Sequence, residues 1–222
     1  MPNKNNFLEE ILLVLYPFNF KIFMESKIRK ILEEEANAIK NIPVTGNFVK
    51  AIDLIHLRVH TLNGKLITAG MGKAGQIAHN IATTFSSTGT PSIFLHPSEA
   101  QHGDLGILQK NDVLLAISNS GKTREIIELI DLKNNLYPDV PVIVITGNPD
   151  SELTQKADCF ILTGAPSEVC PLGLTPTTST TIFTVIGDAL VVMMMEKIGF
   201  TAKDYAKRHH GGYLGAKSRE RS

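Results

Sequence analysis

The sequence predicts an α/β fold in which helices flank a doubly wound, parallel, five-stranded sheet. Five short apolar runs follow one another after residue 64, and each ends in a small or polar residue. Segments with helical spacing of their apolar residues lie between several of these runs. Right-handed crossover connections leave few other arrangements for such an alternation, so the strands should be parallel and covered on both faces.

The five apolar runs are expected to be buried strands, because they are short and rich in leucine and β-branched residues. They are residues 65–70, 92–96, 113–118, 142–147 and 159–164. The segments between them with helical periodicity are residues 75–89 and 123–136, and residues 151–158 could form one or two turns.

Two helices should precede the first strand, because residues 20–61 repeat apolar residues at helical spacing on both sides of Asn41-Ile42-Pro43. The most hydrophobic later segment, residues 182–200, contains Asp188 and Glu196 and falls short of the roughly 18 uninterrupted apolar residues of a bilayer span. It is predicted to be a buried core helix. We therefore expect an N-terminal extension over residues 1–19 and a single domain over residues 20–222.

Composition excludes several classes of protein. Of the 222 residues, 43% are hydrophobic and 20% charged, which is typical of a globular chain and not of a disordered one. Lys+Arg 22 balance Asp+Glu 22, so no excess charge favours nucleic acid or an anionic membrane as a partner. The only cysteines, Cys159 and Cys170, lack the spacing of a zinc or redox motif, and a reducing cytoplasm fits them best.

A glycine pattern, G-x-G-x-x-G, follows the first predicted strand at Gly70–Gly75 and opens a helix. Its backbone N–H groups would bind an anion at the helix N-terminus, and Lys73 would add a positive charge there. A dinucleotide cofactor is disfavoured, because the next strand ends in His96-Pro97 where an acidic residue should hold the ribose. The alternative is a purely structural turn that carries a surface lysine.

A second turn rich in hydroxyl groups follows the third predicted strand. This turn, the serine loop, holds Ser118, Asn119, Ser120 and Thr123 around a glycine. These side chains could bind a phosphate or only cap the next helix, and the residues alone do not separate the two functions. A nucleotide-hydrolase P-loop is not supported, because the position that needs its first glycine holds Ala116.

Three further segments hold titratable side chains. Glu99, His102 and Asp104 lie in a segment without apolar periodicity, where function and a simple capped turn are equally good interpretations. Glu168 lies in a loop rich in proline and glycine, where partial desolvation should make its carboxylate a better base. His209 precedes two glycines and could transfer protons, or belong to a basic, solvated tail.

Taken together, these motifs resemble those of the sugar isomerase (SIS) domain family. Within it the chain is most similar to the enzymes that interconvert D-ribulose 5-phosphate and D-arabinose 5-phosphate for Kdo synthesis, which supplies lipopolysaccharide or capsule. The resemblance covers roughly residues 20–217. Its motifs are residues 70–75, 82–106, 116–123, 168–181, 186–190 and 209–215.

The resemblance implies a role for each site residue. Glu168 would carry a proton between C1 and C2, His209 would open the sugar ring, and Lys73 and His102 would bind substrate oxygens. Further substrate contacts are expected at Gly72, Ser87, Ser118, Asn119, Ser120, Thr123, Thr178 and Ser179. The reaction needs no metal and no cofactor. The resemblance also implies a homo-oligomer, a tetramer, in which the His209 tail reaches a neighbouring site.

Two departures from the family pattern stand out. Lys122 replaces a glutamate that is common after the glycine of the serine loop, and Glu125 is a candidate substitute. Many relatives continue into a pair of CBS domains, whereas this chain stops soon after Gly215, so we expect no regulation through such a module. Two alternatives stay open: a sugar-phosphate sensor without catalysis, and a SIS isomerase of another phosphosugar, such as 6-phospho-3-hexulose.

Overall fold

The computed structural model describes the backbone of residues 4–220 and the burial of side chains over residues 20–220, position 214 excepted. Five parallel strands form one sheet in the order β2-β1-β3-β4-β5. The strands are β1 (Leu66–Gly70), β2 (Ser92–Phe94), β3 (Val113–Ile117), β4 (Val142–Thr146) and β5 (Cys159–Leu162). The predicted five-stranded parallel sheet is therefore confirmed.

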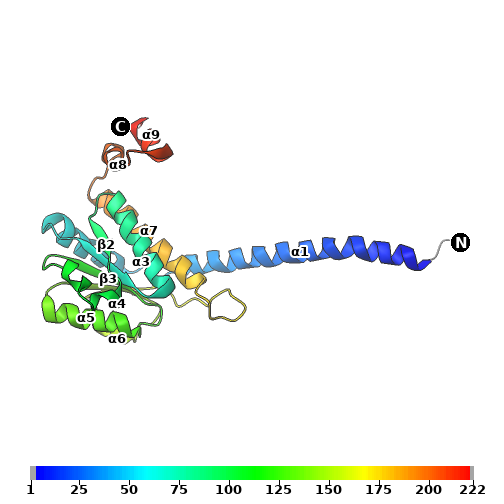
Figure 1. Cartoon of the computed structure of the whole chain (residues 1–222), viewed down its shortest axis with the longest axis horizontal. Coiled ribbons are helices and arrows are strands. Elements are labelled where there is room, and N and C mark those ends of the chain that lie inside the picture. The colour runs from blue at the N-terminus through cyan, green and yellow to red at the C-terminus, as the bar shows by residue number, and fades with distance from the viewer. Residues whose placement is uncertain (1–3, 221–222) are drawn as a thin grey trace.

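Two layers of helices cover the sheet (Figure 1). One face packs against α2 (Gly46–Ile55), α3 (Gly72–Ser87) and α7 (Thr178–Lys197). The other face packs against α4 (Pro97–Ala100), α5 (Arg124–Leu136) and α6 (Glu152–Gln155). Side chains of β3 alternate between the two cores, as Leu115 belongs to the first and Leu114 to the second. This alternation is the doubly wound arrangement that the sequence predicts.

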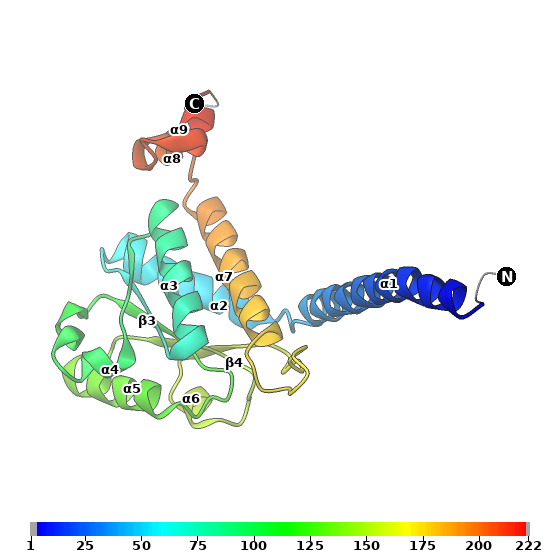
Figure 2. The same ribbon diagram turned by 45° about the vertical axis from the view of Figure 1, so that its right-hand side comes forward.

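The N-terminal helix α1 (Lys4–Lys40) projects away from the sheet (Figures 1 and 2). Among the residues of α1 whose side chains are described, those of its last turns reach the core, where Ala38 and Ile39 pack against the first cluster. The helix runs without a break through residue 19, whereas residues 1–3 lie outside the described part of the chain. The boundary of an N-terminal extension at that position stays a prediction.

Helix α7 is the apolar segment that the sequence assigns to the core. By length and composition it could cross a membrane, but half of that window is buried inside the protein. Ile182, Ile186, Leu190 and Met194 repeat at helical spacing and join the first core. The helix therefore packs as a core helix of the sheet.

The structure adds helices that the sequence did not predict. The segment around His102 holds α4 and a 3-10 turn, η2 (Asp104–Ile107), instead of an open loop. Within the predicted helical stretch of residues 20–61, the turn η1 (His56–Thr61) continues α2 with π-helical geometry, which the sequence did not predict. The tail after residue 200 folds into α8 (Ala202–Arg208) and α9 (Gly212–Glu220). Both helices lie beyond the C-terminal end of α7 (Figure 2).

Candidate active site

The strand order creates a crevice at one place in the sheet. The chain leaves β1 through α3 on one face and leaves the neighbouring β3 through α5 on the other, so connections diverge between these strands. In open α/β sheets, ligands bind outside the carboxyl ends of the strands at such a point. A pocket of about 330 Å³ lies there. Its lining is Met71, Lys73, Ala74, Ile117, Ser118, Asn119, Ser120, Thr123, Pro176, Ser179, Thr180 and Phe183.

The turn after β1 places Lys73 in the first turn of α3. A Cβ atom on Gly75 would lie 2.5 Å from the carbonyl oxygen of Gly70, so glycine permits the close approach of helix and strand. Gly72 has a φ of +56°, a left-handed conformation that favours glycine. Lys73 lines the pocket, while Gly72 lines a second hollow together with His79 and His96.

The serine loop also lines this pocket. The hydroxyls of Ser118 and Thr123 are 2.7 Å apart, and the Gly121 N–H donates to Ser118 Oγ at 3.2 Å. Ser118 is only 3% exposed, and these two contacts restrain its hydroxyl. The N–H groups in the first turn of α5 begin directly after Thr123, which is the N-cap residue. Hydroxyls and helix amides together make a site that suits a phosphate.

The carboxylate of Glu168 contacts the N-terminus of α7, beside the pocket. Its Oε2 accepts hydrogen bonds from Thr177 N at 2.7 Å, Thr177 Oγ1 at 2.9 Å and Ser179 N at 3.3 Å. Partial burial alone would raise the pKa of Glu168, but hydrogen bonds from Ser179 and Thr177 outweigh it, and the pKa is lowered. The expectation that desolvation makes this carboxylate a stronger base is wrong.

The predicted contacts Ser179 and Thr178 are neighbours with different surroundings. Ser179 lines the pocket, and its backbone N–H binds Glu168, so it connects the pocket to the carboxylate. Thr178 is 1% exposed and is not among the residues that line the pocket. Its Oγ1 donates to Glu35 Oε1 at 3.0 Å and accepts from Val169 N at 3.2 Å. A substrate contact by Thr178 stays a prediction.

Two predicted residues lie away from this pocket within one chain. Ser87 ends α3, a helix of 16 residues and so roughly 24 Å long, whose other end carries Lys73. The Ser87 hydroxyl is bonded to the carbonyl of Thr84. The His102 side chain is exposed in the turn after α4, where the backbone N–H of His102 donates to the carbonyl oxygen of Glu99. The chain's own fold does not bring Ser87 or His102 to the pocket.

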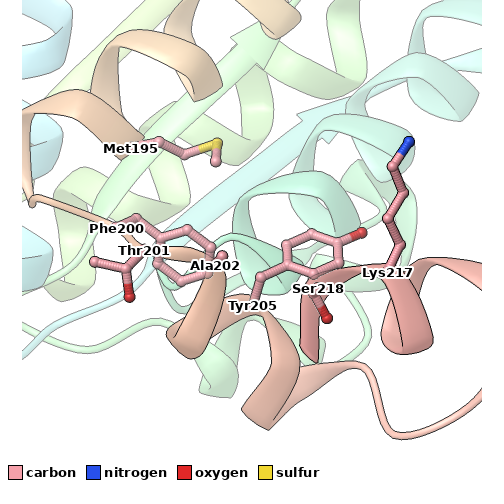
Figure 3. A pocket seen from close by; sticks show the side chains of 7 residues that line it. All are labelled: Met195, Phe200, Thr201, Ala202, Tyr205, Lys217 and Ser218. Atoms are coloured by element: carbon pink, nitrogen blue, oxygen red, sulfur yellow. The ribbon is translucent and has the colours of Figure 1, made fainter. Parts of the chain in front are cut away.

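His209 also lies away from the pocket of its own chain. It follows α8, at the opposite end of α7 from Glu168, and the 20 residues of α7 span roughly 30 Å. Its ring stacks on Tyr205 at 3.7 Å, and its Nδ1 lies 3.0 Å from the Tyr205 carbonyl. Figure 3 shows Tyr205 in a separate pocket of about 300 Å³ between the end of α7, α8 and α9.

Lys122 is exposed at a neighbouring pocket of about 260 Å³, which the serine loop shares. Asn119 and Ser120 line both pockets, and Asn148 lines the second with Lys122. Glu125 lies in the first turn of α5 and lines neither. Lys122 therefore places a positive charge beside the serine loop.

Two further residues near the site escape sequence reasoning. Cys170 accepts hydrogen bonds at Sγ from the N–H groups of Leu174 and Thr175, at 3.2 and 3.1 Å. Glu35 comes from α1 and reaches the N-terminus of α7. Over the part of the chain that the structure describes, no group of three or more His, Cys, Asp or Glu side chains could hold a metal ion.

The sequence model of the SIS domain family matches residues 62–193, more than half of the chain. The chain belongs to the SIS domain family. Among its SIS relatives, the arabinose 5-phosphate isomerase KdsD of Shigella flexneri is 46% identical over 186 residues, which cover 84% of this chain and 55% of the relative. KdsD of Pseudomonas aeruginosa is 44% identical over 194 residues, which cover 87% and 58%. The chain thus spans about half the length of these relatives.

Solved SIS structures share the fold over nearly their whole length. A Bacteroides fragilis protein named as a phosphosugar isomerase involved in capsule formation is 64% identical, with a TM-score of 0.85, covering 86% of this chain and 99% of that chain. An Escherichia coli CFT073 protein in complex with arabinose 5-phosphate is 34% identical, with a TM-score of 0.78, covering 85% and 98%.

Proposed function

We propose that this SIS domain is an aldose–ketose isomerase that interconverts D-ribulose 5-phosphate and D-arabinose 5-phosphate. The observation that supports this best is the position of the Glu168 carboxylate, bonded to Ser179 at the edge of a pocket that Lys73 and the serine loop also line. The arabinose 5-phosphate isomerase relatives and the arabinose 5-phosphate complex support the choice of substrate. The product would supply Kdo synthesis for lipopolysaccharide or capsule.

The serine loop is assigned to the phosphate of the substrate. Ser118, Ser120 and Thr123 offer hydroxyls, and the first amides of α5 offer N–H donors at the positive end of the helix dipole. These groups bind the phosphate in substrate and product alike. The phosphate contacts therefore serve to anchor the pentose while its first two carbons react.

Glu168 is assigned to the proton transfer. Its lowered pKa keeps the carboxylate ionised near neutral pH, so it can accept a proton. It would take the proton from C2 of D-arabinose 5-phosphate, which leaves an enediolate, and return it to C1, while the hydroxyl proton passes from O2 to O1 to give the ketose. The Lys73 ammonium would stabilise the negative charge of the enediolate oxygen.

His209 is assigned to ring opening in a neighbouring subunit, because α7 separates it from the site of its own chain. Apolar side chains exposed on α1, such as Phe20, Phe23 and Leu32, offer further surface for subunit contacts. We propose a homotetramer in the cytoplasm in which the tail of one copy completes the site of another. His102 and Ser87 would be brought to the substrate by the same assembly.

The experiment incubates the protein with D-ribulose 5-phosphate in deuterated buffer and follows C2 by NMR. Formation of D-arabinose 5-phosphate that carries deuterium at C2 is the expected result. Formation of another sugar phosphate would indicate a different SIS isomerase. A second candidate function, sensing without turnover, is favoured by Lys122 beside the serine loop. Binding of the sugar phosphate in calorimetry, without any exchange, would support that candidate and overturn the first.

A further inference from the structure

Glu35 brings a second carboxylate to the N-terminus of α7. It lies near the end of α1, 143 positions before its partner Thr178, and its Oε1 accepts the Thr178 hydroxyl at 3.0 Å. Its other oxygen, Oε2, is buried and has no hydrogen-bond partner among the described residues. Glu35 lines none of the pockets beside the serine loop, so its contacts point to Thr178 and not to substrate.

Thr178 connects Glu35 to the loop of Glu168. A threonine hydroxyl has a single hydrogen, and here Glu35 receives it. The lone pairs of the same oxygen then face Val169 N, which donates to it at 3.2 Å. Val169 directly follows Glu168, so this bond and the three bonds to Glu168 Oε2 fasten adjacent residues to one helix terminus.

The unpaired oxygen of Glu35 argues against a purely stabilising role. A buried carboxylate oxygen without a partner costs stability, because it has lost its bonds to water. Positions where a protein gives up stability concentrate at functional sites. An apolar side chain at this position would avoid the cost but would leave the Thr178 hydroxyl free to rotate away from Val169.

We propose that Glu35 is a positioning residue for the isomerisation, which acts through Thr178 to hold the Glu168 loop in place. This inference rests on the proposed function in one respect: Glu168 must be the group that moves the proton. Glu35 itself does not touch the substrate. Loss of its acceptor oxygen should therefore lower turnover, while the contacts with the substrate phosphate and the affinity for substrate are retained.

The test compares Glu35→Leu, which removes the acceptor, with Glu35→Gln, which keeps an oxygen for Thr178. We expect Glu35→Leu to lower kcat about tenfold or more, since small displacements of a reacting group are costly, with KM within about twofold and an unchanged or higher Tm. Glu35→Gln should restore kcat to within about threefold of the wild type. The control is Glu33→Gln, because Glu33 lies on the same helix and its side chain is exposed. Wild-type kcat in Glu35→Leu, or a loss in kcat that follows a loss in Tm, would overturn the proposal.

A second readout does not depend on turnover. Amide hydrogen exchange at Val169 should be faster in Glu35→Leu than in the wild type and in Glu35→Gln, because its acceptor becomes mobile. Thr178→Val removes the same acceptor, and should accelerate exchange at Val169 even if Glu35→Leu fails to fold. Unchanged exchange at Val169 would overturn the inference. Faster exchange in a protein whose wild type leaves D-ribulose 5-phosphate untouched would overturn the proposed function alone.

Discussion

At the scale of one residue, removal of the Ser118 hydroxyl tests whether the serine loop binds the phosphate. The hydroxyl lies 2.7 Å from Thr123 Oγ1 and accepts from Gly121 N at 3.2 Å, and Ser118 lines the pocket. A hydrogen bond to a charged group contributes about 1.5–3 kcal/mol, so Ser118→Ala should raise KM about tenfold to hundredfold and change kcat little. Steady-state kinetics measure this, with Thr83→Ala on the exposed side of α3 as the control. An unchanged KM would remove Ser118 from the phosphate site.

The two cysteines should differ in reactivity. Hydrogen bonds from Thr175 and Leu174 lower the pKa of Cys170, whereas burial raises the pKa of Cys159. The thiolate is the reactive form, so iodoacetamide should label Cys170 first at neutral pH. Peptide mass spectrometry of a time course gives both rates. Equal rates, or faster labelling of Cys159, would contradict the hydrogen bonds at Cys170.

The residues that sequence reasoning could find differ from those that it could not. Lys73 and Ser118 follow strands directly, so the strand positions place them at the sheet edge. The contact of Glu35 with Thr178 joins residues 143 positions apart, and nothing near Glu35 in the sequence signals it. The direction of the Glu168 pKa depends on donors from Thr177 and Ser179, which only the folded loop brings to its carboxylate.

At the scale of an element, a substitution at the junction of β1 and α3 tests how closely the strand and the helix approach each other. Gly75→Ala would place a Cβ atom 2.5 Å from the backbone oxygen of Gly70, which cannot move without shifting the strand. Overpacking of this kind costs about 1–3 kcal/mol, so thermal unfolding should show a clearly lower Tm. Gly106→Ala is the matched control, since its Cβ would meet nothing within 4 Å. Equal Tm values for the two variants would show that β1 and α3 do not approach closely.

Strands and long helices were predictable because their apolar spacing is strong. The five strands and the core helix α7 lie where the apolar runs indicate. The short helices α4 and α8 were missed, because a few turns carry little periodicity. A local signal for α8 is present: Thr201 and Asp204 form a capping box, and this pair can be recognised in the sequence.

At the scale of the whole molecule, mixed oligomers test whether two copies of the chain share one active site. Because α7 separates His209 from Glu168 within one chain, each active site should take these residues from different copies. Glu168→Gln and His209→Asn homo-oligomers should each be nearly inactive, and mixed oligomers made by refolding both variants together should regain part of the activity. The same variants mixed without refolding serve as the control. Mixed oligomers without regained activity would show that the site is not shared.

The central claim is that Glu168 carries the proton between C1 and C2, and one measurement tests it most directly. Glu168→Gln keeps the shape of the side chain but removes the base. In deuterated buffer the variant should bind D-ribulose 5-phosphate as the wild type does, while NMR shows that incorporation of deuterium at C2 of the product, D-arabinose 5-phosphate, is slowed by about 10²–10⁴-fold, the usual contribution of a general base. Exchange at close to the wild-type rate in this variant would contradict the account.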